Sequence, residues 1–242
     1  MKTIPPLVVV LLALVVGGCG SSGNGAAGTQ ALPQGPTIPA EPEAGKVLEE
    51  FVRAAGRHDS PAMWKLLSPF SQARYGPTDG QFAVGAGKEF GATMGEFVRH
   101  GEWKLVVAAR PSKEWAVAAI SGYIITKGKQ SYGAYATPLR QIGGKWYLEP
   151  TGTVKFTPAT PDTELVEQDS TPSIGSELSA NEPILDAVIW VDDATLVPEL
   201  AADELFIAGD VLVPLEKGWH TVVTFADTQS SAGANAFTFR TG

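Results

Sequence analysis

Four short runs of strand-forming residues follow one another between residues 102 and 149, and the connections between them are very short. The runs cover residues 103–110, 115–126, 130–141 and 145–149, with three or four residues between neighbours. Such connections leave no room for a crossover helix, so consecutive strands must pair antiparallel as a meander. Apolar residues occupy both faces of the run 115–126. We therefore expect both faces of this sheet to be covered.

Helical patterns precede this meander. Apolar residues recur at helical spacing over 46–56, over 60–70 and over 89–99. Asp59 stands where a helix-capping side chain is expected, and Ser60-Pro61 marks a helix start. Five residues of this part could serve as an acid or base but are expected at helix ends, at edges or in solvent. They are His58, His100, Glu89, Glu96 and Glu102.

This order of three helices and a curved antiparallel meander resembles the NTF2-like family, which includes SnoaL-like and ketosteroid-isomerase-like proteins. The resemblance rests on Arg57-His58-Asp59 and on the segments 63–68 and 144–148. It implies an α+β cone, in which three helices and a curved antiparallel sheet enclose an apolar cavity with an aromatic wall. The candidate residues for lining this cone are Trp64, Phe90, Phe97, Trp103, Trp115, Tyr123, Tyr135 and Trp146.

The cone is compatible with three classes of function. A SnoaL-like isomerase or hydrolase needs an acid or base inside the cavity together with an oxyanion donor such as tyrosine. The sequence offers tyrosines but no evident base, and large aromatic side chains fill cores without any cofactor. We therefore predict a non-enzyme without cofactors. It is expected to act as a binding or interaction module, with a carrier of a small apolar ligand as the first alternative and a SnoaL-like enzyme as the second.

The N-terminus has the pattern of a lipoprotein leader. An apolar run of ten residues, 7–16, follows Lys2, and as a helix it spans only about 15 Å against roughly 30 Å of bilayer hydrocarbon, as a signal sequence does. Val16-Gly17-Gly18-Cys19 resembles the bacterial lipobox, which implies acylation of Cys19, for example with palmitate, and cleavage before it. The predicted location is the extracytoplasmic face of the cell membrane or the periplasm, with the membrane as a partner through lipidated Cys19.

Composition divides the chain into segments. Residues 1–18 are the predicted signal peptide, 19–42 a disordered Gly- and Pro-rich tether, 43–157 the NTF2-like domain and 158–172 a Pro- and acid-rich linker. Residues 173–242 contain short strand signals and no helical period. The segment 215–222 resembles the Leu-x-x-Gly-x-His-Thr-Val segment of bacterial Ig-like domains, and implies a small all-β Ig-like sandwich in which Gly218 permits the turn.

Charge argues against nucleic acid as a partner, because the net charge is −8 and phosphate binding requires a basic surface. Residues 43–157 carry 15 Lys and Arg against 10 Asp and Glu, whereas residues 158–242 carry 2 against 15. These opposite net charges, +5 and −13, predict a salt-sensitive association of the two domains. Possible partners beyond the membrane are an envelope protein or a small apolar ligand.

Metal sites are not expected. Cys19 is the only cysteine, so neither a disulfide within the chain nor a thiolate cluster can form. Asp227-Thr228-Gln229 resembles the Asp-x-His sequence near the end of copper-binding periplasmic proteins, but it has glutamine in place of the histidine ligand. His220 is expected to serve packing or hydrogen bonding. The acidic pairs Asp192-Asp193 and Asp203-Glu204 lack the spacing of a calcium loop and are expected at a solvated surface.

Lipidation of Cys19 is directly testable. Cys19→Ser removes the acyl acceptor, so the variant should leave the detergent-extractable membrane fraction or accumulate as uncleaved precursor. Fractionation and immunoblotting of cells that express either form provide the measurement. A variant that is processed and retained like the wild type would contradict the predicted anchor.

Overall fold

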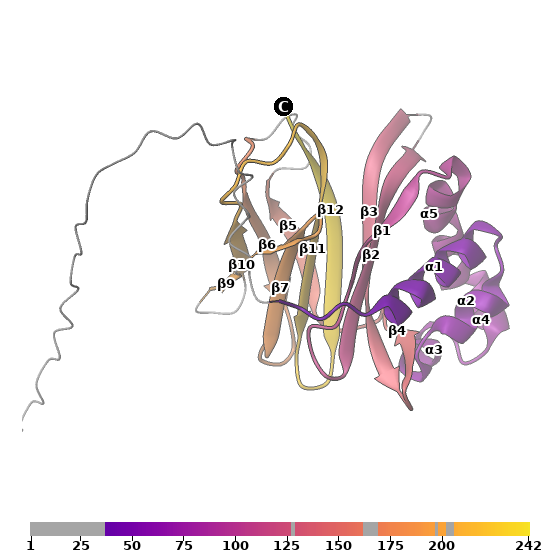
Figure 1. The fold of residues 1–242 in the computed structure, drawn as a ribbon. Helices are drawn as coiled ribbons and strands as arrows, with labels where there is room; N and C mark the ends of the chain where they lie inside the picture. The colour runs from indigo at the N-terminus through magenta and orange to yellow at the C-terminus, as the bar shows by residue number, and fades with distance from the viewer. Residues whose placement is uncertain (1–36, 127–128, 162–168, 197, 202–205) are drawn as a thin grey trace, which may run out of the picture. The chain divides into compact units, whose positions relative to one another are not determined.

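The computed structural model describes residues 37–126, 129–161, 169–196, 198–201 and 206–242. All of them belong to one compact unit, Ala31–Gly242 (Figure 1). The predicted signal peptide with Cys19, residues 19–36 of the predicted tether, residues 162–168 of the predicted linker and the pair Asp203-Glu204 lie outside the described residues. Within the described part, no helix has the length and apolar character needed to cross a membrane.

The described chain begins with helices. They are α1 (Pro42–Gly56), α2 (Ser60–Leu66), α3 (Pro69–Tyr75), α4 (Asp79–Val84) and α5 (Ala86–His100). The Asp59 carboxylate accepts a hydrogen bond from the Ala62 amide at 3.1 Å, so its predicted capping role is confirmed. Ser68 caps the next helix and Pro69 opens it. The single helix predicted over 60–70 is therefore wrong, because a second helix start interrupts it.

The predicted meander is confirmed as sheet A. It consists of β1 (Trp103–Ala109), β2 (Trp115–Thr126), β3 (Lys129–Ile142) and β4 (Lys145–Leu148). These strands pair antiparallel in chain order. The Gly143-Gly144 turn has positive φ at both residues, which suits a two-residue hairpin connection.

Both faces of sheet A are buried, as the sequence predicts. On one face lie Ala116, Ala118, Ile120, Leu139 and Leu148, which pack against the helices in a helix-side core. The opposite face packs against a second sheet in what we call the inter-sheet core. Its buried members are Val107, Ala109, Trp115, Val117, Ala119, Ala136, Val188, Trp190, Val223, Phe225 and Ala232.

The second half of the chain forms two further antiparallel sheets. Sheet B has the order β5-β6-β10-β9, with β5 (Lys155–Thr160), β6 (Ser173–Ser179), β10 (Phe206–Asp210) and β9 (Glu199–Leu200). Sheet C has the order β12-β11-β7-β8, with β12 (Ala232–Thr241), β11 (Gly218–Asp227), β7 (Asp186–Val191) and β8 (Ala194–Leu196). A third apolar core, which includes Ile174, Ile207, Val222 and Phe239, lies between sheets B and C.

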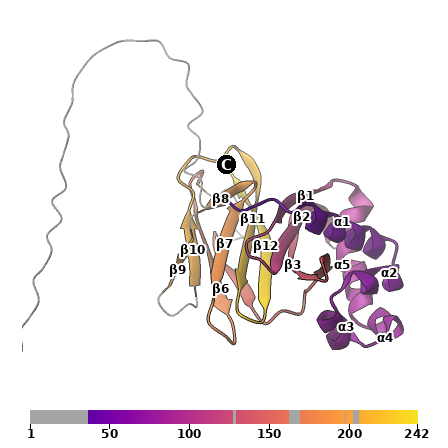
Figure 2. The same ribbon diagram turned by 60° about the horizontal axis from the view of Figure 1, so that its bottom comes forward.

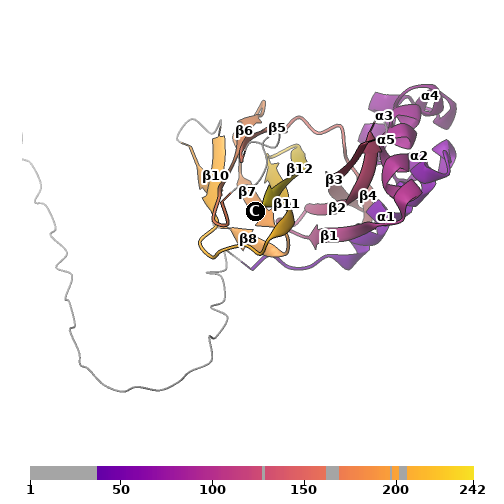
Figure 3. The ribbon, with the colours of Figure 1, turned by 90° about the horizontal axis from the view of Figure 1, so that it is seen from above.

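Sheet C therefore contributes to two cores, because alternate residues along a strand face opposite sides. On β11, Val222 and Ala226 face sheet B, while Val223 and Phe225 face sheet A. Within this unit the helices, sheet A, sheet C and sheet B follow one another as layers, and the helices all lie on the same side of sheet A (Figures 2 and 3).

The predicted fold class is wrong. The chain is mostly β, with five helices among the described residues and three four-stranded antiparallel sheets, and it does not form a cone of three helices in a curved sheet followed by a separate Ig-like sandwich. The physical reason is the apolar character of both faces of sheet A, because helices cover only one of them. The boundary predicted between residues 157 and 158 falls inside β5, which pairs with β6.

The end of the predicted tether is ordered against β1. Ala40 forms an antiparallel bridge with Ala109, the Glu41 amide donates to the Ala108 carbonyl at 2.9 Å, and the Arg110 amide donates to the Pro39 carbonyl at 2.8 Å. Ile38 packs against the inter-sheet core. Residues 38–41, which we call the N-terminal strap, thus cover the end of β1 at the outer edge of sheet A.

Aromatic and polar contacts surround the inter-sheet core. Tyr132 of β3 stacks on Trp219 of β11 with ring centroids 5.7 Å apart, and the Thr238 hydroxyl donates to the Tyr132 carbonyl at 2.9 Å. Among the described residues, no ion pair joins the helix and sheet A half to sheets B and C. The contact between the halves is apolar at its centre, and the salt-sensitive association expected from net charge stays a prediction.

A shared inter-sheet core predicts that both halves unfold together. Phe225 is 0% exposed in this core, so Phe225→Ala should lower the free energy of unfolding by about 3–5 kcal/mol. Urea unfolding followed by far-UV circular dichroism and by tryptophan fluorescence should show one coincident, shifted transition.

Leu212→Ala is the matched control, because Leu212 is 66% exposed and its replacement should change stability by less than about 0.5 kcal/mol. Two separated transitions, of which only one shifts in Phe225→Ala, would show that the halves are independent.

Candidate functional site

The eight aromatic residues predicted to line one cavity lie on both faces of sheet A. Trp64, Phe90, Trp103 and Tyr135 pack at the border of the helix-side core, and Phe97 and Trp146 are buried in it. Trp115 is buried in the inter-sheet core on the other face. Tyr123 follows Trp115 by an even number of residues on β2 and contacts Tyr132, with ring centroids 5.2 Å apart. Strand alternation thus separates Trp115 and Tyr123 from the other six.

Most of these aromatic side chains are occupied by contacts within the protein. Phe90 makes an edge contact with Phe51 at 5.1 Å, and the Trp64 ring nitrogen donates to the Gly76 carbonyl at 3.2 Å. Arginine side chains cover three of the tryptophans, with centroid distances of 5.6 Å for Arg53 over Trp103, 5.3 Å for Arg110 over Trp146 and 5.2 Å for Arg140 over Trp115.

Two of the eight, Phe97 and Tyr135, line an open groove between helix α5 and the hairpin of β2 and β3. We call it the α5 groove, and its volume is about 360 Å³. Its complete lining is Ala92, Thr93, Glu96, Phe97, Ile124, Gly133, Ala134 and Tyr135. Phe97 is 3% exposed and belongs to the helix-side core, so the floor of the groove is continuous with a rigid packed layer.

Glu96 is the carboxylate residue of this lining, and its side chain is 24% exposed. Its Oε1 atom pairs with Arg99 Nη1 at 2.9 Å. Its Oε2 atom is buried and has no hydrogen-bond partner among the described residues. The sequence predicted Glu96 at a solvated or edge position. It directly precedes Phe97, which is buried in the helix-side core, and the Glu96 side chain lies at the border of that core.

Tyr135 adds a phenol that stays protonated. Burial raises its pKa, the neighbouring Tyr75 raises it further, and a hydrogen bond with Thr137 lowers it. Because the phenolate form is disfavoured, Tyr135 serves as a neutral wall residue of the groove at ordinary pH.

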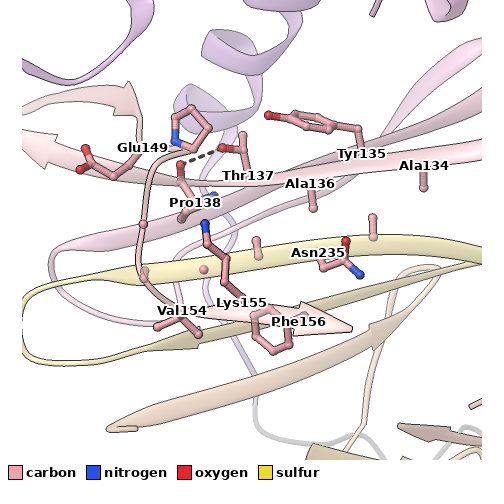
Figure 4. Close-up of a pocket in the computed structure, with 16 residues that line it drawn as sticks. Ala134, Tyr135, Ala136, Thr137, Pro138, Glu149, Val154, Lys155, Phe156 and Asn235 are labelled. Carbon is pink, nitrogen blue, oxygen red and sulfur yellow. Dashed lines mark hydrogen bonds between the residues drawn. The ribbon is translucent and has the colours of Figure 1, made fainter. Parts of the chain in front are cut away.

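A second hollow lies at the seam between sheets A and C, where β3 faces β12 and the segment after β4 crosses between them (Figure 4). Its volume is about 280 Å³, and small residues dominate the two facing strands. A Cβ atom on Gly152 would lie 1.8 Å from the Ala232 carbonyl oxygen, and one on Gly233 would lie 2.2 Å from that of Val154. The backbones approach so closely here that only glycine fits at either position.

Polar side chains lie at this seam but point in different directions. Lys155 extends its ammonium group between the two strands, whereas the Glu149 carboxylate points away from it (Figure 4). Glu149 is 2% exposed, and its Oε2 atom lacks a partner among the described residues. Burial raises its pKa, while a hydrogen bond from Ser68 and the charge of Arg140 lower it.

The surroundings of Glu149 form a buried polar cluster that joins α3 to the end of β4. The Ser68 amide donates to the Leu148 carbonyl at 2.8 Å, the Ser71 amide donates to Ser68 Oγ at 3.0 Å, and the hydroxyls of Ser71 and Thr151 lie 2.8 Å apart. These contacts make the cluster a structural connection between helix and sheet.

His220 serves hydrogen bonding, as the sequence predicts. Its Nδ1 atom lies 2.8 Å from Asp192 Oδ2, and its Nε2 atom lies 2.8 Å from the Glu216 carbonyl and 3.1 Å from Thr241 Oγ1. Asp192 Oδ1 also accepts from the Thr221 amide at 2.9 Å. Thr241 is 1% exposed and His220 6% exposed, so these two side chains are enclosed at the turn before β11, whereas the Asp192 side chain is 43% exposed.

The acidic pair Asp192-Asp193 borders a hollow of about 370 Å³ with Lys104 and the 42% exposed Trp219. Both carboxylate oxygens of Asp192 are already bound within the protein. Within the described ranges, no group of three or more His, Cys, Asp or Glu residues is placed to hold a metal ion.

Comparison with known proteins adds no relative. No protein-family model matches the chain, and a search of curated proteins finds no match. These comparisons leave the resemblances to the lipobox, to NTF2-like proteins and to Ig-like domains untested, and the cone and separate sandwich that the last two imply differ from the observed fold.

The buried carboxyl of Glu149 predicts a pH dependence of stability. Its pKa in the folded state is raised above the ordinary value of 4.5, so its contribution to stability is full below pH 4.5 and is lost as the pH rises through the folded pKa. The loss amounts to about 1.4 kcal/mol for each tenfold difference in proton affinity between the two states. Urea unfolding of Glu149→Gln between pH 4.5 and 8 should show a flatter profile than that of the wild type.

Glu182→Gln is the control, because the pKa of Glu182 shifts in the opposite direction from that of Glu149. Hydrogen bonds from Ser230 and Thr228 lower the pKa of Glu182. Its contribution is present above the ordinary pKa and is lost at lower pH. A wild-type profile between pH 4.5 and 8 that Glu149→Gln leaves unchanged would contradict the assignment to Glu149.

Proposed function

We propose that the protein is a lipid-anchored binding protein of the cell envelope, held by Cys19 at the extracytoplasmic face of the membrane. Its described part is a non-catalytic binding module that takes a small, mainly apolar ligand in the α5 groove. The observation that supports this proposal most is the groove itself. Its volume of about 360 Å³ lies within the range of small-molecule sites, which is roughly 300–1,000 Å³.

The lining of the groove supports an apolar ligand. Ile124 and Tyr135 supply partly exposed carbon surfaces, the edge of the buried Phe97 lies at the floor, and Ala92, Gly133 and Ala134 leave room between them. A single carboxylate side chain, Glu96, accompanies them. Predominantly apolar walls with a small number of placed polar groups are typical of sites that orient a small ligand.

The chemistry of the lining supports a role without catalysis. Among the described residues, the carboxyl groups whose pKa lies above the ordinary value, because of burial, are Glu149 and Asp227. Neither lines the α5 groove. A general base is effective when its pKa is tuned and it reaches the ligand directly or through one water molecule, and these two carboxyls lack that position.

Protein interaction is the second candidate function. It is favoured by Phe70 on α3 and Val84 at the end of α4, which are 51% and 83% exposed. In that case the α5 groove has no small ligand, and a probe of ligand size should show no saturable binding to it.

Filling the groove should abolish probe binding. Ala92 lines the groove and is exposed on α5, so Ala92→Trp should fold and occupy the space. The chain from residue 19 with Cys19→Ser retains the whole compact unit Ala31–Gly242. It should bind the neutral dye Nile red saturably at about 10 µM, equivalent to about −7 kcal/mol, and Ala92→Trp should weaken this binding at least tenfold.

Ala73→Trp is the matched control, because Ala73 is an exposed alanine on α3 that does not line the groove. It should bind the dye like the parent chain. Fluorescence titration measures all three proteins. Absence of saturable binding, or equal weakening by both substitutions, would contradict the proposal.

A further inference from the structure

Glu96 is the polar feature of the α5 groove that the protein leaves incomplete. Its Oε2 atom is buried and has no partner among the described residues, and a buried acceptor without a hydrogen bond is costly. The Glu96 side chain lines the groove, and the terminal torsion of a glutamate is soft, so the carboxylate is free to reorient. A ligand with a hydrogen-bond donor would satisfy this oxygen.

The charge of Glu96 is already balanced. Arg99 lies one helical turn further along α5 and pairs with Oε1 at 2.9 Å, although its side chain is 62% exposed. What the carboxylate lacks is therefore a hydrogen bond and not a counter-ion. A second cation beside Arg99 would meet like-charge repulsion, whereas a neutral donor would not.

We propose that the occupant of the α5 groove is an apolar molecule with a neutral hydroxyl group, which donates a hydrogen bond to Glu96 Oε2 while its carbon skeleton lies against Phe97, Ile124 and Tyr135. This inference rests on the proposed function and specifies the class of its ligand. An alcohol is favoured over an amine by Arg99, and over a plain hydrocarbon by the unpartnered oxygen.

Three probes of nearly equal shape test the class. They are 2-ethylnaphthalene, 2-naphthalenemethanol and 2-(aminomethyl)naphthalene, which end in a methyl, a hydroxyl and an ammonium group. The alcohol should bind the chain from residue 19 with Cys19→Ser about tenfold more tightly than the ethyl compound, as a hydrogen bond to a charged group predicts, and more tightly than the ammonium compound. Dissociation constants are measured by titration with NMR detection.

Glu96→Met removes the acceptor and keeps a side chain of similar length. It should abolish the advantage of the alcohol and leave the affinity for the ethyl compound unchanged. Glu89→Met is the matched control, because Glu89 is an exposed carboxylate of α5 outside the groove, and it should keep the advantage. Arg99→Met leaves the carboxylate without its counter-ion and should shift the preference toward the ammonium probe.

The outcomes separate this inference from the proposed function. Equal binding of the three probes, an ammonium preference in the parent chain, or an alcohol preference that survives Glu96→Met would overturn the hydroxyl class while the groove still binds apolar molecules. Failure of all three probes to bind, together with failure of the dye, would overturn the proposed function itself.

Discussion

The apolar contact between sheet A and sheet C determines the arrangement of the other layers. A helix-covered sheet with one polar face is complete by itself, but β2 carries apolar residues on both faces, among them Val117 and Ala119 on the side away from the helices. Sheet C supplies the matching surface through Trp190, Val223 and Phe225. Because β7, β11 and β12 of sheet C also face sheet B with their alternate residues, two cores depend on the same strands. The stability of either half is therefore linked to the other.

The same packing explains where an open site remains. Most large side chains of sheet A are used in the two cores, and the α5 groove lies where the hairpin of β2 and β3 passes the end of the helix-side core. Phe97 belongs to both the core and the groove. A ligand placed there lies against a surface that folding has already fixed, which lowers the ordering cost of binding.

The sequence was most informative where the physical signal is local. Turn residues and short connections predicted the meander of sheet A, and strand β2 was predicted with the bounds that the structure has, Trp115–Thr126. A short cap such as Asp59 was recognisable because its partner is three residues away. The segments 155–160 and 173–179 were missed as strands, since Pro158, Gly175 and several serines weaken their strand pattern.

The candidate site was harder to predict, because its residues come from one helix and two strands. The sequence predicted Phe97 and Tyr135 as lining residues of a cavity, but it grouped them with Trp115 and Tyr123, which strand alternation places on the other face. Apolar periodicity shows that both faces are buried and does not show what covers each face. The unpartnered oxygen of Glu96 depends on side-chain positions in three dimensions, and no pattern in the sequence reports it.

The N-terminal strap also affects how sheet A can pair with other molecules. An outer strand with free backbone groups is a template for pairing with the same strand of a neighbouring molecule. Residues 39–41 occupy the Ala108 carbonyl and the Arg110 amide at the end of β1, and Pro39 has no amide hydrogen to offer to a further strand. At the opposite end of sheet A, β4 has only four residues. The part of the chain closest to the proposed anchor thus blocks the end of β1 against pairing with a second molecule.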